Sequence, residues 1–234
     1  MKAAIHERLQ QALDMLPICS CIADIGSDHG WASIRAVQTG IAQRVIATDI
    51  SEASLQKTRD LVKLAGLEQQ IECRRGDGLN VLKKGEAEAA LIAGMGSELI
   101  ADIVLQGKEV SFEMRCLVLQ PMNEAAPLRK RLAEGGFCIC KEAIVLEKGH
   151  FYQTLMVKKG AFQPLSPIEE ELGTFVFREK VPLCGEFVEA RLKKLEKAVD
   201  SIGKYGGPQA AERKEQLKRK IEEYREVLAW IAAK

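Results

Sequence analysis

Short runs of apolar and β-branched residues alternate with longer segments of helical hydrophobic spacing over the first two-thirds of the chain. The short runs predict strands at 19–24, 44–49, 71–74, 89–93 and 116–119, followed by 137–145 and 152–158. The longer segments predict helices at 31–39, 51–65, 98–106 and 125–134. Such alternation favours right-handed crossovers and a mainly parallel sheet covered by helices on both faces. We therefore expect an α/β protein.

Two local signals refine this arrangement. Only a short linker around Lys148 and Gly149 separates the last two strands, which is too short for a crossover helix. These strands should form an antiparallel hairpin at one end of the sheet. Ser51 stands directly before a helical pattern and is expected to cap that helix.

The last third of the chain has a different pattern. Two highly charged segments carry apolar residues at alternating spacings of three and four, and Gly206, Gly207 and Pro208 separate them. Two such seams predict an antiparallel coiled-coil hairpin whose helices bury each other. We therefore expect a Rossmann-like domain over 1–160 and a linker with a helical arm over 161–234. The seam residues are Val188, Leu192, Leu195, Val199 and Ile202, then Leu217, Ile221, Tyr224, Leu228 and Ile231.

Composition limits the possible settings. The formal net charge is +1, which excludes a histone-like polycation but permits a local basic patch that binds nucleic acid. We find no apolar run long enough to span a bilayer, and His6, Glu7 and Arg8 stand where a signal peptide would be apolar. The seven cysteines include no C-x-x-C pair, so reduced thiols are favoured over a zinc site or a disulfide framework. A cytoplasmic protein without a metal or a membrane partner is expected.

The segment Asp24–Gly30 follows the first predicted strand and precedes a helix, which is where open α/β sheets bind ligands. Gly26 and Gly30 permit a tight turn, but Asp28 replaces the second glycine of a dinucleotide fingerprint. A carboxylate at that position would repel a pyrophosphate. It would favour a cationic nucleoside without phosphates, and S-adenosylmethionine, with its sulfonium and ammonium groups, fits that description.

Further acidic residues follow the next strands. Asp49 ends the second strand, close to the roughly 20-residue offset at which an acid binds ribose hydroxyls. Asp77 follows the third strand and is a candidate acceptor for an adenine amino group. Each of these acids alone is better explained as a loop or helix cap, but four at successive strand ends, Asp24 and Asp28 included, favour one ligand site. The fourth strand ends in the bend 94–96, where a donor and an acceptor would meet.

Four motifs resemble the bacterial tRNA (adenine-N1)-methyltransferases that modify position 22. They are Asp-Ile-Gly-Ser-Asp-His at 24–29, Gly-Asp-Gly-Leu at 76–79, Ile-Ala-Gly-Met-Gly at 92–96 and Leu-Gln-Pro at 119–121. The resemblance implies a class I methyltransferase domain followed by a coiled-coil hairpin, an S-adenosylmethionine donor and a tRNA substrate. The expected donor-binding residues are Asp24, Gly26, Ser27, Asp28, Gly30, Asp49, Ile50, Asp77, Gly78, Gly94, Met95 and Gly96.

The chemistry expected of this acceptor is simple. Adenine N1 carries an in-plane lone pair and attacks a sulfonium methyl without first losing a proton, so catalysis rests on positioning and on stabilising a cationic product base. Asp28 is the candidate for that stabilisation. His29 is a candidate to hydrogen-bond the base or carry its proton, or else a structural histidine. The candidate RNA-binding residues are Arg129, Arg131, Arg213, Lys214, Lys218 and Arg225.

Other functions stay open. A methyltransferase of a small molecule or a protein would use the arm to form a homodimer. A nonenzymatic interaction protein would use its Rossmann-like body to display the coiled coil, and the charged arm residues would then be an ordinary solvated surface. A nicotinamide dehydrogenase is disfavoured because Asp28 opposes the pyrophosphate.

Overall fold

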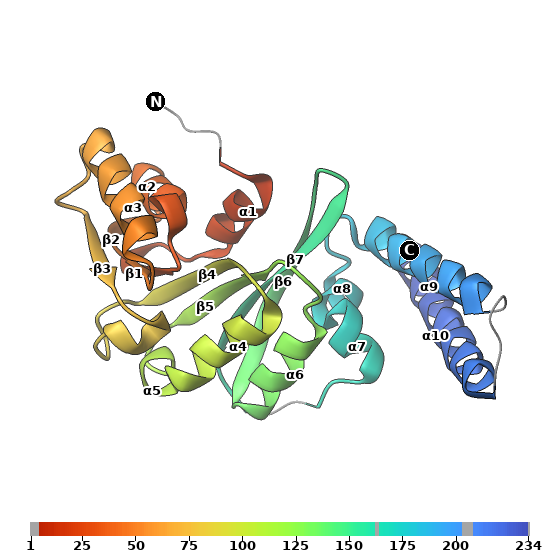
Figure 1. Ribbon diagram of the computed structural model, residues 1–234. Helices are drawn as coiled ribbons and strands as arrows, with labels where there is room; N and C mark the ends of the chain where they lie inside the picture. The colour runs from red at the N-terminus through yellow and green to blue at the C-terminus, as the bar shows by residue number, and fades with distance from the viewer. Residues whose placement is uncertain (1–4, 162–163, 203–207, 234) are drawn as a thin grey trace.

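The computed structural model describes residues 5–161, 164–202 and 208–233. Its centre is a seven-stranded sheet in the order β3-β2-β1-β4-β5-β7-β6 (Figure 1). The first five strands are parallel, and β7 pairs antiparallel with both β5 and β6. Both the parallel sheet and the terminal hairpin predicted from the sequence are confirmed. The strands are β1 (Cys19–Ile25), β2 (Ala42–Asp49), β3 (Ile71–Arg75), β4 (Ala89–Met95), β5 (Cys116–Pro121), β6 (Phe137–Glu147) and β7 (His150–Lys159).

Helices cover both faces of this sheet. One face carries α1 (Glu7–Met15), α2 (Trp31–Gln38) and α3 (Glu52–Ala65), which bury a core that includes Leu13 and Val62. The other carries α4 (Ser97–Gln106), α5 (Lys108–Ser111) and α6 (Ala126–Glu134), with a core that includes Ile100 and Leu128. Two 3-10 turns, η1 (Asp28–Gly30) and η2 (Gly78–Val81), follow strands β1 and β3. Neither α1 nor α5 was predicted from the sequence.

The predicted cap of α3 is confirmed. The backbone N–H of Ser54 donates to the Ser51 hydroxyl oxygen at 3.3 Å. This bond satisfies one of the free N–H groups in the first turn, so α3 begins directly after β2.

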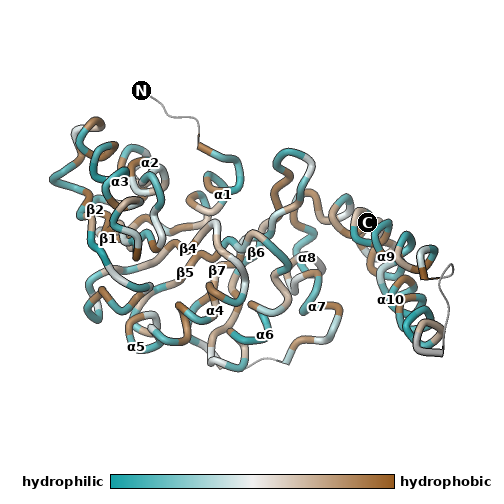
Figure 2. Tube along the Cα trace, in the orientation of Figure 1, coloured by the Kyte–Doolittle hydropathy of each residue, from teal (hydrophilic) through white to brown (hydrophobic). Residues whose placement is uncertain are grey.

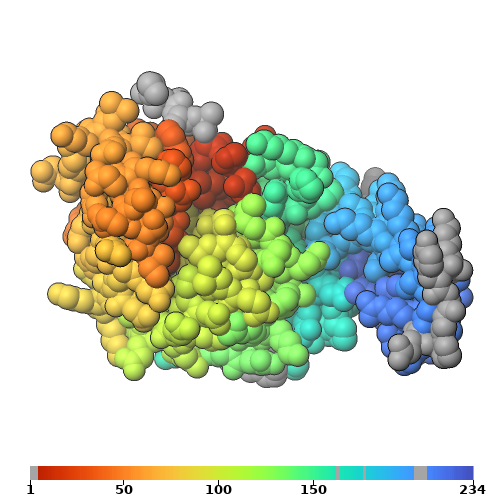
Figure 3. All heavy atoms as spheres, viewed as in Figure 1, coloured from red at the N-terminus to blue at the C-terminus, as the bar shows by residue number. Residues whose placement is uncertain are grey.

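The last part of the chain is helical and forms one end of the molecule (Figures 1 and 3). Two short helices, α7 (Pro167–Leu172) and α8 (Thr174–Glu179), lead into α9 (Cys184–Ile202) and α10 (Pro208–Ala232). Hydrophilic and hydrophobic residues alternate along α9 and α10 (Figure 2). The glycines predicted to separate these helices lie outside the described residues.

A third hydrophobic cluster joins this end to the sheet. Val188 of α9 and Tyr224 of α10 are buried in it together with Ile144 of β6. The helices therefore pack against each other and, at their base, against the β6–β7 hairpin. Between them, Arg225 of α10 pairs with Glu196 of α9 at 3.1 Å.

The structure has no disulfide among the cysteines, all seven of which are free. Within the described ranges, no helix combines the length and apolarity that crossing a membrane requires. The same residues contain no group of three or more His, Cys, Asp or Glu side chains placed to hold a metal ion.

Candidate active site

The sheet reverses its strand order at β1. The chain proceeds from β1 outward through β2 to β3 and then returns to β4 on the other side of β1. The carboxyl ends of β1 and β4 therefore leave a crevice between the helices that follow them. A cavity of about 600 Å³ occupies this place.

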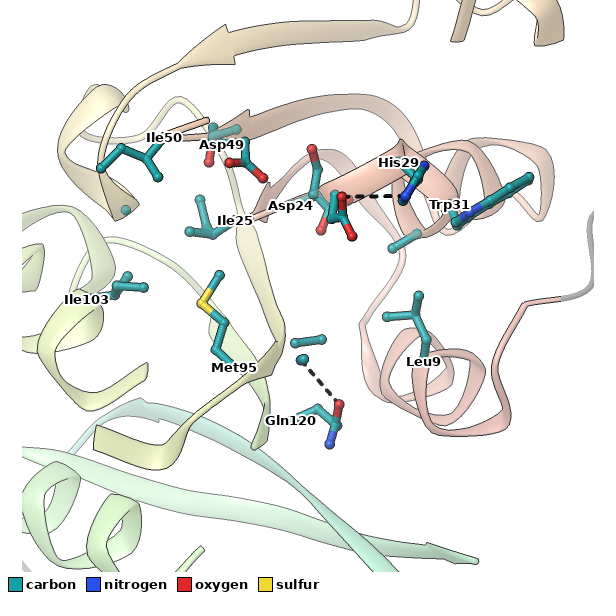
Figure 4. A pocket seen from close by; sticks show the side chains of 18 of the residues that line it. Leu9, Asp24, Ile25, His29, Trp31, Asp49, Ile50, Met95, Ile103 and Gln120 are labelled. Carbon is teal, nitrogen blue, oxygen red and sulfur yellow. Dashed lines mark hydrogen bonds and ion pairs between the residues drawn. The ribbon is translucent and has the colours of Figure 1, made fainter. Parts of the chain in front are cut away.

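All four aspartates predicted from the strand ends line this one cavity. Asp24 and Asp49 point toward it from the ends of β1 and β2 (Figure 4). Asp28 and Asp77 are exposed at its rim, on the turns after β1 and β3. The cavity is thus acidic on the side of β1, β2 and β3, as the sequence predicts.

Backbone hydrogen bonds hold the turn after β1 in place. The N–H groups of Gly26 and Ser27 both donate to the Thr48 carbonyl oxygen, at 2.8 and 2.9 Å. Gly26 has φ +72°, and a Cβ there would lie 2.0 Å from the terminal methyl carbon of Met95. The turn therefore needs glycine both for its backbone conformation and for the space beside Met95.

Asp24 is the only buried carboxylate among the four. Its Oδ2 accepts a hydrogen bond from the Ser33 hydroxyl at 2.5 Å, which ties the end of β1 to α2. Burial raises the pKa of Asp24 to about 6, against the lowering effect of the Ser33 hydrogen bond, and the nearby Asp49 adds to the rise. A cation bound in the cavity would favour the ionised form.

Asp49 is half-buried and keeps part of its hydrogen-bonding capacity. Its Oδ1 accepts from the backbone N–H of Ser51 at 2.8 Å. Ile50, with an exposed side chain, stands beside it over the cavity (Figure 4). Asp49 therefore offers a carboxylate for hydroxyl groups, and Ile50 offers an apolar surface for a flat ring.

The opposite wall comes from β4 and β5. Gly94 has φ +79° and nothing within 4 Å of the position of a Cβ, so its backbone opens to the cavity. The buried Gln120 side chain fixes this bend: its Oε1 accepts from the Gly94 N–H at 3.3 Å, and its Nε2 donates to the Pro121 carbonyl oxygen at 2.6 Å.

The catalytic candidates share the η1 turn. His29 has φ +56°, a left-handed conformation uncommon for a side-chain-bearing residue. Its Nε2 lies 3.7 Å from Asp28 Oδ1, and both residues line the cavity. The turn thus presents an imidazole and a carboxylate to the same space.

Ten of the twelve residues predicted to bind the donor line the cavity. Gly30 and Gly96 do not. A Cβ on Gly30 would lie 2.6 Å from the Thr58 side chain, so Gly30 permits close packing of the turn on α3. Gly96 precedes the first residue of α4.

Several lining residues were not predicted. His6, Arg8 and Leu9 come from the start of α1, Trp31 from α2, and Leu99 and Ile103 from α4. Leu9 belongs to a helical pattern with Ala12, Leu13 and Leu16 that could have revealed α1. Glu147 holds this segment, since its carboxylate accepts from Arg8 Nη1 at 2.7 Å and lies 2.9 Å from His6 Nδ1.

One RNA-binding prediction is wrong. Arg129 has no solvent exposure, and its guanidinium pairs at 2.7 Å with the equally buried Glu142. It also donates to the Glu170 carbonyl oxygen at 2.9 Å. Arg129 therefore joins α6, β6 and α7 inside the protein and cannot reach a nucleic acid.

Of the other candidate cations, three at the surface take part in ion pairs. Arg131 binds Glu98 and Asp102 of α4, Lys218 lies near Glu215, and Arg225 binds Glu196 and Glu222. Arg213 is exposed and Lys214 is half-buried on α10. Their part in RNA binding stays a prediction.

A seven-stranded sheet of this order with an acidic cavity at the reversal point defines a Rossmann-like methyltransferase. A family described as "Methyltransferase domain" matches residues 5–155. The tRNA (adenine(22)-N(1))-methyltransferase of Bacillus subtilis is 37% identical over 156 residues, which span 67% of this chain and 66% of that protein. That match extends over just under two thirds of the relative.

Solved structures extend the similarity to the helical end. The crystal structure of the B. subtilis m1A22 tRNA methyltransferase TrmK superposes with a TM-score of 0.84 at 30% identity, covering 96% of this chain and 99% of that one. A Streptococcus pneumoniae putative tRNA (m1A22) methyltransferase, solved with S-adenosyl-L-methionine, gives 0.84 at 30% identity and covers 96% and 100%. The chain belongs to the family of tRNA (adenine(22)-N1)-methyltransferases.

Proposed function

We propose that this protein transfers a methyl group from S-adenosylmethionine to N1 of adenine 22 in tRNA. Family membership supports the reaction, and the observation that carries the donor assignment is the convergence of Asp24, Asp28, Asp49 and Asp77 on one cavity. Four carboxylates disfavour a phosphate-bearing dinucleotide and favour a cation.

The lining residues fit this donor part by part. Asp49 is placed for the ribose hydroxyls, and Ile50 gives an apolar surface for the adenine ring. Asp77 is placed to accept from the adenine amino group. Asp24 supplies negative charge for the ammonium group, and Gly94, with nothing within 4 Å of its Cβ position, leaves room for close approach of the donor.

S-adenosylmethionine, when bound, supplies an electrophilic methyl group on sulfur. The N1 lone pair of the acceptor base would form a bond to that methyl carbon while the carbon–sulfur bond breaks and its electron pair stays on sulfur. No proton is lost beforehand, so the protein needs no base to start the reaction. Asp28 stabilises the positive charge that develops on the acceptor ring. His29 orients the base by a hydrogen bond, and Gln120 positions the Gly94 bend beside it.

The setting and partners follow from the substrate. The protein acts on tRNA in the cytoplasm, and the surface cations of α10 supplement the body in holding that tRNA. The division into a methyltransferase domain over 1–160 and an arm over 161–234 remains part of the proposal.

A homodimer through the arm would need a face other than the seam, because Val188 and Tyr224 are already buried within one chain. Light scattering tests the dimer.

Methyl transfer to an unmodified tRNA transcript tests the proposal. The protein is incubated with labelled donor and with transcripts carrying adenine or guanine at position 22, and N1-methyladenine is located by its block to reverse transcription. Label and block should appear only with adenine 22. A folded protein that binds the donor but leaves this transcript unmodified would refute the proposal and favour a small-molecule or protein substrate.

A further inference from the structure

A second groove lies next to the proposed active site. The pairing of β5 with β7 ends at Leu119 and Leu155, whereas β7 continues to His150. Beyond that point the edge of β7, the loop after β5 and the helix α9 enclose a space of about 400 Å³, which we call the flanking groove. Its residues are Met122–Glu124, Gly149–Gln153, Phe187, Ala190, Arg191 and Lys194.

The cavity at the carboxyl ends of β1 and β4 is called the donor cavity below. The flanking groove adjoins it at two places. Gln120 lines the cavity and Met122, two residues further along the chain, lines the groove. The Arg8 guanidinium, which lines the cavity, lies 5.5 Å from the centre of the Tyr152 ring, which lines the groove. A polymer that places one unit in the cavity therefore has its next units at this groove.

Three aromatic rings line the groove, of which Phe187 is buried and Phe151 and Tyr152 are half-buried. Phe151 and Phe187 form an edge-to-face pair with ring centres 5.8 Å apart. Tyr152 projects from the opposite face of β7 because successive side chains alternate along a strand. The rings thus flank the strand edge on both sides, and unpaired bases stack on such surfaces without sequence preference.

The charge of the groove is opposite to that of the donor cavity. Among the residues that the structure describes, Glu124 is the only carboxylate lining it, and Arg191 neutralises that carboxylate in an ion pair. The Arg191 guanidinium also lies 4.8 Å from the Phe187 ring centre. Lys194 is exposed one turn further along α9 and makes no ion pair with any residue of the described ranges. An anionic occupant is therefore favoured here, and a cationic one in the cavity.

We propose that the flanking groove holds the nucleotides adjacent to the target adenine, with a base against the aromatic wall and a phosphate at Lys194. The inference rests on the proposed function, since it takes the polymer to be RNA. It assigns Tyr152 and Lys194 as positioning residues that act on the acceptor strand.

Three variants test these assignments. Lys194→Ala should raise the KM for tRNA severalfold and reduce the slope of log affinity against log salt by about 1, because one phosphate contact is lost. Tyr152→Ala should raise that KM by roughly fivefold to 150-fold, the range for losing one stacked base, whereas Tyr152→Phe should keep the parent value. The matched control is Lys63→Ala in the last turn of α3, outside both sites.

Donor affinity measured by calorimetry checks that each variant is folded, and kcat should stay within about twofold of the parent. Unchanged tRNA affinity and salt slope in both Lys194→Ala and Tyr152→Ala would overturn the inference. Fluorescence anisotropy with a labelled transcript measures tRNA binding without turnover. A loss of tRNA binding at the groove can therefore be distinguished from a loss of methyl transfer.

A cross-linking measurement requires no variant. The parent protein is irradiated with a transcript that carries 4-thiouridine immediately 3′ of the target adenine. Cross-linked peptides should come from 149–153 or 187–194. Cross-links confined to other segments would contradict the proposal.

Discussion

The hydroxyl of Ser33 donates to Oδ2 of the buried Asp24 at 2.5 Å, so an acid that lines the cavity also anchors α2. This bond lowers the pKa of Asp24, but burial outweighs it. The folded protein thus holds the Asp24 proton more tightly than the unfolded chain does.

This relationship predicts a pH dependence of stability. The pKa of Asp24 is about 6 in the folded protein and 3.8 when unperturbed, so its contribution to stability is complete below about pH 4 and is lost as pH rises through 6. The loss is about 3 kcal/mol at 1.36 kcal/mol per pKa unit. Asp24→Asn does not titrate, so its unfolding free energy should rise relative to the parent between pH 4 and 7. Urea titrations without donor measure the difference, and a constant difference would contradict the assignment.

Asp49 is predicted to contribute strongly to donor affinity. Asp49→Ala removes a charged acceptor for the ribose hydroxyls, and such hydrogen bonds are worth about 1.5–3 kcal/mol each. The dissociation constant for S-adenosylmethionine should rise by roughly tenfold to 150-fold. Asp60→Ala, an exposed acid of α3 outside the cavity, should have no effect. Equal affinities of the two variants would exclude Asp49 from the donor site.

Gln120 is predicted to act on the rate through Gly94. Gln120→Leu leaves the Gly94 N–H and the Pro121 carbonyl without the hydrogen bonds that they have now. The bend that presents the reacting groups should loosen and kcat should fall by tenfold or more, because misplacement by about 1 Å is costly to catalysis. Gln120→Glu keeps one acceptor, so its kcat should lie between those of the parent and of Gln120→Leu. Parent-like kcat in Gln120→Leu would show that the bend needs no such support.

The buried pair of Arg129 and Glu142 is predicted to matter for stability. Arg129→Ala leaves the Glu142 carboxylate buried without its partner, and breaking such a pair costs about 3–5 kcal/mol. The double variant Arg129→Leu/Glu142→Leu should recover part of that loss. Denaturant midpoints test both, and a double variant no more stable than Arg129→Ala would contradict this explanation.

The sheet and much of the cavity could be predicted from the sequence because both depend on local patterns. Strand ends carry the acids, and parallel strands bring those ends to one edge. The burial of Arg129 could not be predicted from the sequence, because it depends on Glu142 and on the α7 backbone folding against α6. The same limit applies to Arg8, whose position depends on Glu147 at the far end of the sheet.

We propose that the acidic cavity selects a cationic nucleoside without phosphates. Calorimetric titration of the purified protein with S-adenosylmethionine and, separately, with NADH tests it most directly. We expect saturable binding of S-adenosylmethionine that weakens in Asp49→Ala, and no binding of NADH. Binding of NADH in place of S-adenosylmethionine would contradict it.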